Sequence, residues 1–109
     1  AGALSGKYRN GQMPKNSRMT LFKGWERMIN PIAMKAYDEY YKLAKEYGIT
    51  MVQLSQAFVN SRPFVTSNII GATTMEQLKE NIGSIEIKLT EEMMNQINLI
   101  HNNNPNPSP

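Results

Sequence analysis

The sequence predicts an α/β fold that is mostly helical and contains one buried strand, at about residues 65–70. Three observations support this prediction. Apolar residues recur every three or four positions along much of the chain, which is typical of amphipathic helices. One short segment, VTSNII, is rich in β-branched residues, which favour a strand. Glycine and proline separate these segments, as they do at the ends of helices and strands.

The composition is that of a small domain without disulfides. The chain has 109 residues, a net charge of +3 and no cysteine. It therefore forms one domain at most, without a disulfide scaffold or a cysteine-based zinc site, and we expect a cytoplasmic location and no metal centre. No apolar run approaches the roughly 20 residues that span a bilayer, so we expect no membrane association. Because the chain begins with Ala1 in the middle of a motif, we expect further residues upstream.

The first part of the chain is basic. We call residues 1–30 the basic segment; its glycines and Pro14 predict a loop. Its first 25 residues contain no acidic side chain and five basic ones, namely Lys7, Arg9, Lys15, Arg18 and Lys23. Such a loop suits a phosphate group, although an ordinary solvated loop is the alternative. Nucleic acid is a weaker alternative, because Tyr8, Phe22 and Trp25 follow no recognisable nucleic-acid motif, and we expect none as partner.

Two helices follow the basic segment. The first begins after Asn30, a capping residue, and ends at Gly48, a residue typical of helix C-termini. The second begins with Thr50 and Gln53, which are spaced as in a capping box. Pro63 ends it, because proline restricts the residue before it.

The last helix begins near Thr90, where two glutamates in its first turn complement the helix dipole. The closing residues, rich in Asn and Pro, predict an extended tail. The chain therefore divides into the basic segment, the closing helices and strand over residues 31–101, and the tail over residues 102–109.

The stretch IIGATTMEQLKENI, residues 69–82, combines a strand end, a small-residue turn and a helix start. Gly71 permits a tight turn and a close approach of a ligand to the backbone. Thr74 and Gln77 are spaced as in a capping box. A helix that starts just after a strand directs its unpaired N–H groups toward the carboxyl edge of the sheet, which creates an anion site. The alternative is an ordinary strand-to-helix turn.

A single strand cannot satisfy its own backbone groups and needs neighbouring strands. The chain is therefore predicted to be part of a larger parallel sheet. The order helix, helix, strand, helix suits the C-terminal portion of a (β/α)₈ TIM barrel, which typically needs about 250 residues. The expected partner is the remainder of the barrel or another copy of the chain.

Three motifs in this order resemble the C-terminal third of an aldo-keto reductase. They are GALSGKY after the seventh barrel strand, the arginine-containing NSRMTLF loop, and IIGATTMEQLKENI after the eighth strand. The resemblance covers essentially the whole chain. It is closest to the branch that includes the Tas-type bacterial enzymes and the potassium-channel beta subunits.

The resemblance implies an NADPH site. In the family the third motif holds the adenosine 2′-phosphate and the adenine. Carried over by position, Gly71 and Thr73 contact the phosphate, and Gln77 lines the adenine ribose region, where other branches have arginine. Glu80 and Asn81 hydrogen-bond the adenine amino edge, or else they form a plain helix C-terminus.

The basic segment completes the implied site. The resemblance places Gly2, Lys7 and Arg18 along the pyrophosphate and the 2′-phosphate. Many relatives have Lys-Ser where this chain has Gly71 and Ala72. One phosphate-binding cation is therefore absent, so a preference for NADPH depends on Arg18, and NADH is the alternative cofactor.

Family members reduce carbonyl compounds by hydride transfer, with a tyrosine acid tuned by lysine, aspartate and histidine. These four residues belong to the first half of the barrel, so we assign no catalytic residue here. The parent protein is expected to reduce a small carbonyl substrate, and this chain alone is expected to be inactive. Tyr41 and Lys45 have a Y-x-x-x-K spacing, which we attribute to an amphipathic helix, and His101 is expected to be structural or exposed. The alternative function is a non-catalytic nucleotide-binding or oligomerising module.

Overall fold

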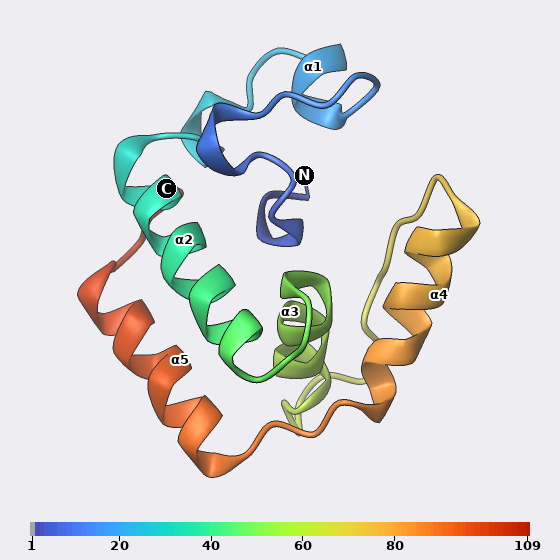
Figure 1. The fold of residues 1–109 in the computed structure, drawn as a ribbon, viewed down its shortest axis with the longest axis vertical. Helices are drawn as coiled ribbons and strands as arrows, with labels where there is room; N and C mark the ends of the chain where they lie inside the picture. The colour runs from blue at the N-terminus through green and yellow to red at the C-terminus, as the bar shows by residue number, and fades with distance from the viewer. Residues whose placement is uncertain (1) are drawn as a thin grey trace.

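The structure, a computed structural model, describes residues 2–109, and its regular secondary structure is entirely helical, with no β-strand among these residues. Its α-helices are α1 (Arg18–Leu21), α2 (Pro31–Glu46), α3 (Met51–Asn60), α4 (Met75–Gly83) and α5 (Glu91–Asn103). Short 3₁₀ turns connect them: η1 (Ala3–Ser5), η2 (Arg9–Gly11), η3 (Glu26–Met28) and η4 (Ser84–Glu86). Figure 1 shows α2 and α5 side by side, with α3 at the centre and α4 beyond it.

The predicted starts of the long helices are confirmed. The Asn30 side chain accepts a hydrogen bond from the backbone N–H of Ala33 at 3.0 Å and so caps α2. Thr50 and Gln53 form a complete capping box at the start of α3. The Thr90 hydroxyl caps α5. These caps satisfy N–H groups that a helix cannot pair internally, and each typically contributes about 1 kcal/mol.

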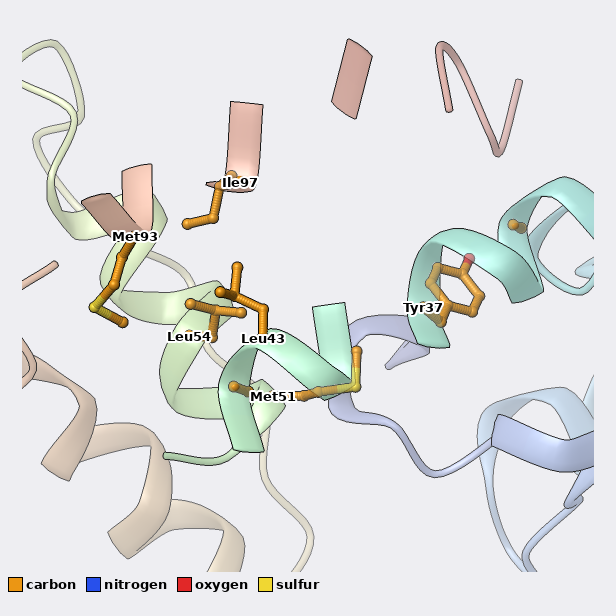
Figure 2. Packing of buried hydrophobic residues seen from close by; sticks show 8 residues of the cluster. Tyr37, Leu43, Met51, Leu54, Met93 and Ile97 are labelled. Carbon is orange, nitrogen blue, oxygen red and sulfur yellow. The ribbon is translucent and has the colours of Figure 1, made fainter. Parts of the chain in front are cut away.

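The core lies where α2, α3 and α5 meet (Figure 2). Each helix contributes the apolar face that its sequence periodicity predicts. Burial of one large apolar side chain contributes about 1.5–3 kcal/mol, so these contacts fix the three helices relative to one another. The buried cluster consists of Ala33, Tyr37, Leu43, Ala44, Met51, Leu54, Met93 and Ile97.

The basic segment is more ordered than the loop that the sequence predicts. Tyr8 and Met19 are buried in it, so it has a small core of its own. Arg9 joins it to α2, because its Nε lies 2.8 Å from Asp38 Oδ1 and its guanidinium lies 3.5 Å from the centre of the Tyr41 ring. The segment is therefore a folded part of the molecule.

The prediction of a buried strand at residues 65–70 is wrong. This segment forms no regular secondary structure, and Ile69 is 95% exposed. A strand needs a partner for its backbone groups, and the described part of the chain offers none. The segment is held by the side chain of Asn68, which donates to the side chains of Gln56 and Asn60 on α3.

The end of the chain lies against α2. The last helix extends through Asn103, beyond the expected start of the tail. Asn104 is 3% exposed, and its Nδ2 donates to Glu39 Oε2 at 2.7 Å. Asn30 Nδ2 donates to the carbonyl oxygen of Pro107 at 2.8 Å. The residues after α5 are therefore attached to the body of the molecule.

Candidate cofactor site

The predicted cofactor residues form two groups in the structure. One group lies in the basic segment and the other in residues 71–81. The turn η1 and the helix α4 both contact α3, although they are far apart in the sequence. In Figure 1 the loop before α4 runs up from the level of α3, and only its upper end lies in the same half of the molecule as α1. No hydrogen bond or ion pair joins the two groups among the described residues.

Gly2 and Lys7 lie together. Gly2 has a φ of +81°, a conformation that L side chains rarely adopt. A Cβ on Gly2 would lie 2.8 Å from Lys7 Nζ, so the ammonium group lies against the backbone at Gly2. This arrangement places a positive charge beside an accessible stretch of backbone.

Arg18 is exposed at the first position of α1. Its guanidinium lies 5.7 Å from the centre of the Trp25 ring. Neither Arg18 nor Lys7 forms an ion pair with a carboxylate within residues 2–109. Both cations therefore keep their charge available for an anionic ligand.

Thr73 and Gln77 are brought together at the start of α4. The Oε1 of Gln77 accepts hydrogen bonds from the Thr73 backbone N–H at 2.8 Å and from the Thr73 hydroxyl at 3.1 Å. The Thr74 hydroxyl caps the Gln77 backbone N–H at 3.3 Å, as predicted. The predicted capping box is only half formed, because the Gln77 side chain bonds to Thr73 instead of to the Thr74 backbone.

The start of α4 favours negative charge. Hydrogen bonds from its own backbone N–H and from the Thr74 hydroxyl lower the pKa of Glu76. Unpaired amides and the positive end of the dipole have this effect at a helix start. Gly71 is exposed, and an added Cβ there would meet nothing within 4 Å. Its φ is not in the left-handed region, and its backbone is accessible.

Asn81 and Glu80 lie at the end of α4 with different surroundings. Asn81 is 8% exposed, and its Nδ2 donates to the carbonyl oxygen of Gly71 at 3.1 Å. Asn81 therefore fixes the loop that carries Thr73. Glu80 is half-buried. The structure thus joins Asn81 to Gly71 and Gln77 to Thr73 by hydrogen bonds.

Sequence reasoning missed the role of Tyr8. Tyr8 is 1% exposed, so its ring is not available for stacking on a base, whereas Phe22 is 62% exposed. The hydroxyl of Tyr8 accepts a hydrogen bond from the backbone N–H of Met19. The only feature of the sequence that could have indicated the burial of Tyr8 is its position as an aromatic residue among charged and small ones.

Other chemistry finds no support in the described residues. The Tyr41 ring is covered by the guanidinium of Arg9, which agrees with a structural role for Tyr41. His101 is exposed on α5. Within residues 2–109 no group of three or more His, Cys, Asp or Glu side chains could hold a metal ion. None of the described helices has the length and apolar character needed to cross a membrane.

The family model for the Aldo/keto reductase family matches residues 1–102. Over 108 residues the chain is 40% identical to "Protein tas" of Escherichia coli (strain K12), covering 99% of this chain and 31% of that protein. It is 34% identical over 112 residues to "Putative voltage-gated potassium channel subunit beta" of Schizosaccharomyces pombe, which covers 96% of this chain and 32% of that protein. It is 30% identical over 111 residues to "Probable voltage-gated potassium channel subunit beta" of Oryza sativa subsp. japonica, which covers 96% of this chain and 34% of that protein.

The chain thus spans about a third of the length of the curated relatives it matches. The matches extend over nearly the whole chain, including the basic segment and the α4 region. This chain belongs to the aldo/keto reductase family, in the branch that contains Tas and the potassium-channel beta subunits.

Proposed function

We propose that this chain is the C-terminal part of an NADPH-dependent aldo-keto reductase and supplies the adenosine and phosphate half of the cofactor site. The observation that carries the proposal is the presence of two chemically matched groups in one folded chain. One group contains the unpaired cations Lys7 and Arg18, and the other contains the helix start of α4. The family resemblance implies that both groups serve the same cofactor.

The residues present fit the phosphates of NADPH. Arg18 is exposed and presents a planar fork of donors, which suits the 2′-phosphate. Thr73 lies in an exposed loop just before a helix start that favours negative charge. Lys7, beside the backbone of Gly2, suits the pyrophosphate. These assignments follow the family resemblance position by position.

The end of α4 is assigned to the adenosine. Glu80 is half-buried and offers a carboxylate acceptor to the adenine amino group. Gln77 lines the ribose region. The amide nitrogen of Asn81 is bonded to the carbonyl oxygen of Gly71. We therefore assign the side-chain oxygen of Asn81 to the adenine edge.

The chemistry of the parent protein is the reduction of a small carbonyl compound. When bound, NADPH supplies the hydride. The proton-donating tyrosine of the family and its partner residues have no counterpart in this chain. We therefore propose that the chain alone has little or no reductase activity. The lack of cysteine favours a reducing compartment, so we propose a cytoplasmic location.

The test is a fluorescence titration of the complete natural protein with NADPH and NADH. Arg18→Ala should weaken NADPH by on the order of 10- to 100-fold, the range that one charge-assisted phosphate contact predicts. NADH should bind almost unchanged, because it lacks the 2′-phosphate. Arg27→Ala is the matched control, since Arg27 is exposed in the same segment and is not assigned to the site.

Glu80→Ala provides the opposite pattern in the same titration. It should weaken NADPH and NADH alike, because both carry adenine. If Arg18→Ala weakens both cofactors equally, or neither, the assignment of Arg18 to the 2′-phosphate is wrong.

A second candidate function is a non-catalytic interaction module. Phe64, Ile69 and Ile85 are 81%, 95% and 71% exposed, and such apolar side chains favour a protein partner. The remainder of the barrel or another copy of the chain would cover them. The mass of the natural protein separates the candidates, because a complete barrel corresponds to roughly 35 kDa.

A further inference from the structure

Tyr8 is the largest side chain among the described residues that is less than 2% exposed. It lies in a segment that is otherwise rich in charged and small residues. Burying so large a ring requires that the rest of the segment fold around it. Tyr8 therefore organises the basic segment.

The hydroxyl of Tyr8 acts at the start of α1. It accepts a hydrogen bond from the backbone N–H of Met19, with an N–O distance of 3.4 Å. Met19 directly follows Arg18, the first residue of α1. The first N–H groups of a helix have no partner within it and are usually capped by the residue before the helix.

Ser17 occupies that capping position but does not cap. Its side chain makes no capping hydrogen bond, and its Oγ lies 3.1 Å from Thr20 Oγ1. The Tyr8 hydroxyl takes over this role from a distant position in the sequence. The start of α1, and with it Arg18, is therefore attached to the buried Tyr8.

The protonation chemistry of Tyr8 agrees with this geometry. Burial raises its pKa, but hydrogen bonds with Ser17 and with the Met19 N–H, together with the charge of Lys7, lower the pKa below its ordinary value. Donors and positive charge thus converge on the phenolic oxygen. The Met19 amide is one of the donors that face this oxygen.

The ring of Tyr8 also contacts the second cation of the site. Lys7 Nζ lies 5.3 Å from the ring centre, within the range of a cation–π interaction. The neighbouring Arg9 fixes this part of the chain to Asp38 on α2. Tyr8 therefore joins Lys7, Arg18 and the body of the molecule.

We propose that Tyr8 is a positioning residue that holds Arg18 where the 2′-phosphate binds and thereby sets the preference for NADPH over NADH. This inference rests on the function proposed above. A cation held in the binding position need not be ordered by the ligand. When only a fraction of molecules presents the cation correctly, the apparent affinity falls by that fraction.

Tyr8→Phe in the complete natural protein tests the proposal. The change keeps the ring beside Lys7, and it removes the hydroxyl together with its hydrogen bonds to the Met19 N–H, Ser17 and Lys7. NADPH binding should weaken by about 3- to 10-fold, the range expected for one lost capping hydrogen bond, while NADH binding changes little. A residue that served the fold alone would affect both cofactors equally.

Tyr37→Phe is the matched control. Tyr37 is also buried, at 4% exposed, and its hydroxyl lies 3.1 Å from Ser108 Oγ, away from the predicted site. Its loss should leave the ratio of NADPH to NADH affinity unchanged. In an Arg18→Ala background, Tyr8→Phe should cause no further loss of NADPH affinity, because the two residues act as one unit.

Hydrogen exchange gives a second readout that does not depend on cofactor. The Met19 amide should be protected in the unsubstituted protein, and it should exchange about 3- to 10-fold faster in Tyr8→Phe, again the effect of one lost cap. An unprotected Met19 amide in the unsubstituted protein overturns the proposal even if the variant fails to fold. The proposal is also overturned if Tyr8→Phe leaves the ratio of NADPH to NADH affinity unchanged while Arg18→Ala changes that ratio. If Arg18→Ala leaves the ratio unchanged, the proposed function itself fails.

Discussion

Asn81 shows how a single residue can belong both to a binding site and to the fold. The family resemblance assigns it to the adenine edge, whereas the structure shows its amide nitrogen bonded to the carbonyl oxygen of Gly71. At 8% exposed, Asn81 is one of the few buried polar residues among those described. We therefore propose that its main contribution is to hold the loop at Gly71.

Asn81→Ala should lower the free energy of unfolding by about 1 kcal/mol, the net value of one hydrogen bond. Chemical denaturation of the complete protein measures this change. Asn95→Ala, at an exposed position on α5, is the control and should have no measurable effect. Weaker cofactor binding with unchanged stability would show instead that Asn81 serves the adenine directly.

At the scale of elements, the end of the chain connects α5 to α2. Asn104 donates both to Glu39 on α2 and to the carbonyl oxygen of Ile100 on α5. Asn30 caps α2 and also donates to the carbonyl oxygens of Arg27 and Pro107. The basic segment, α2 and the tail therefore meet at one hydrogen-bonded junction.

Asn104→Ala should lower the free energy of unfolding by about 1.5 kcal/mol. This is the lower end of the range for a hydrogen bond to a charged group, because the Glu39 carboxylate is partly exposed. Thermal or chemical denaturation measures it, with Asn102→Ala at an exposed position as the control. Equal stability of the two variants would mean that the tail contributes little to the fold.

At the scale of the whole molecule, the sequence predicts local features well and long-range ones poorly. The caps at Asn30, Thr50 and Thr90 depend on residues within one helical turn, and all three are present. The strand at 65–70 fails, because a strand depends on partners elsewhere. The candidate site follows the same rule.

Within the site, Thr73 and Gln77 are near neighbours in the sequence, and the structure does bring them together. The bond from Met19 to Tyr8 joins two parts of a segment predicted to be a loop, and no local pattern announces it. Long-range contacts depend on the packing of the whole segment. Sequence reasoning therefore finds contacts between near neighbours more readily than contacts between distant parts of a segment.

The central claim is that this part of the protein recognises the adenosine 2′-phosphate. It is tested most directly with ligands that contain only that half of the cofactor. Calorimetric titration of the complete protein compares adenosine 2′,5′-bisphosphate with adenosine 5′-monophosphate, which differ only in the 2′-phosphate. The bisphosphate should bind on the order of 10- to 100-fold more tightly, and Arg18→Ala should abolish most of this difference. Equal binding of the two ligands by the unsubstituted protein would contradict the claim.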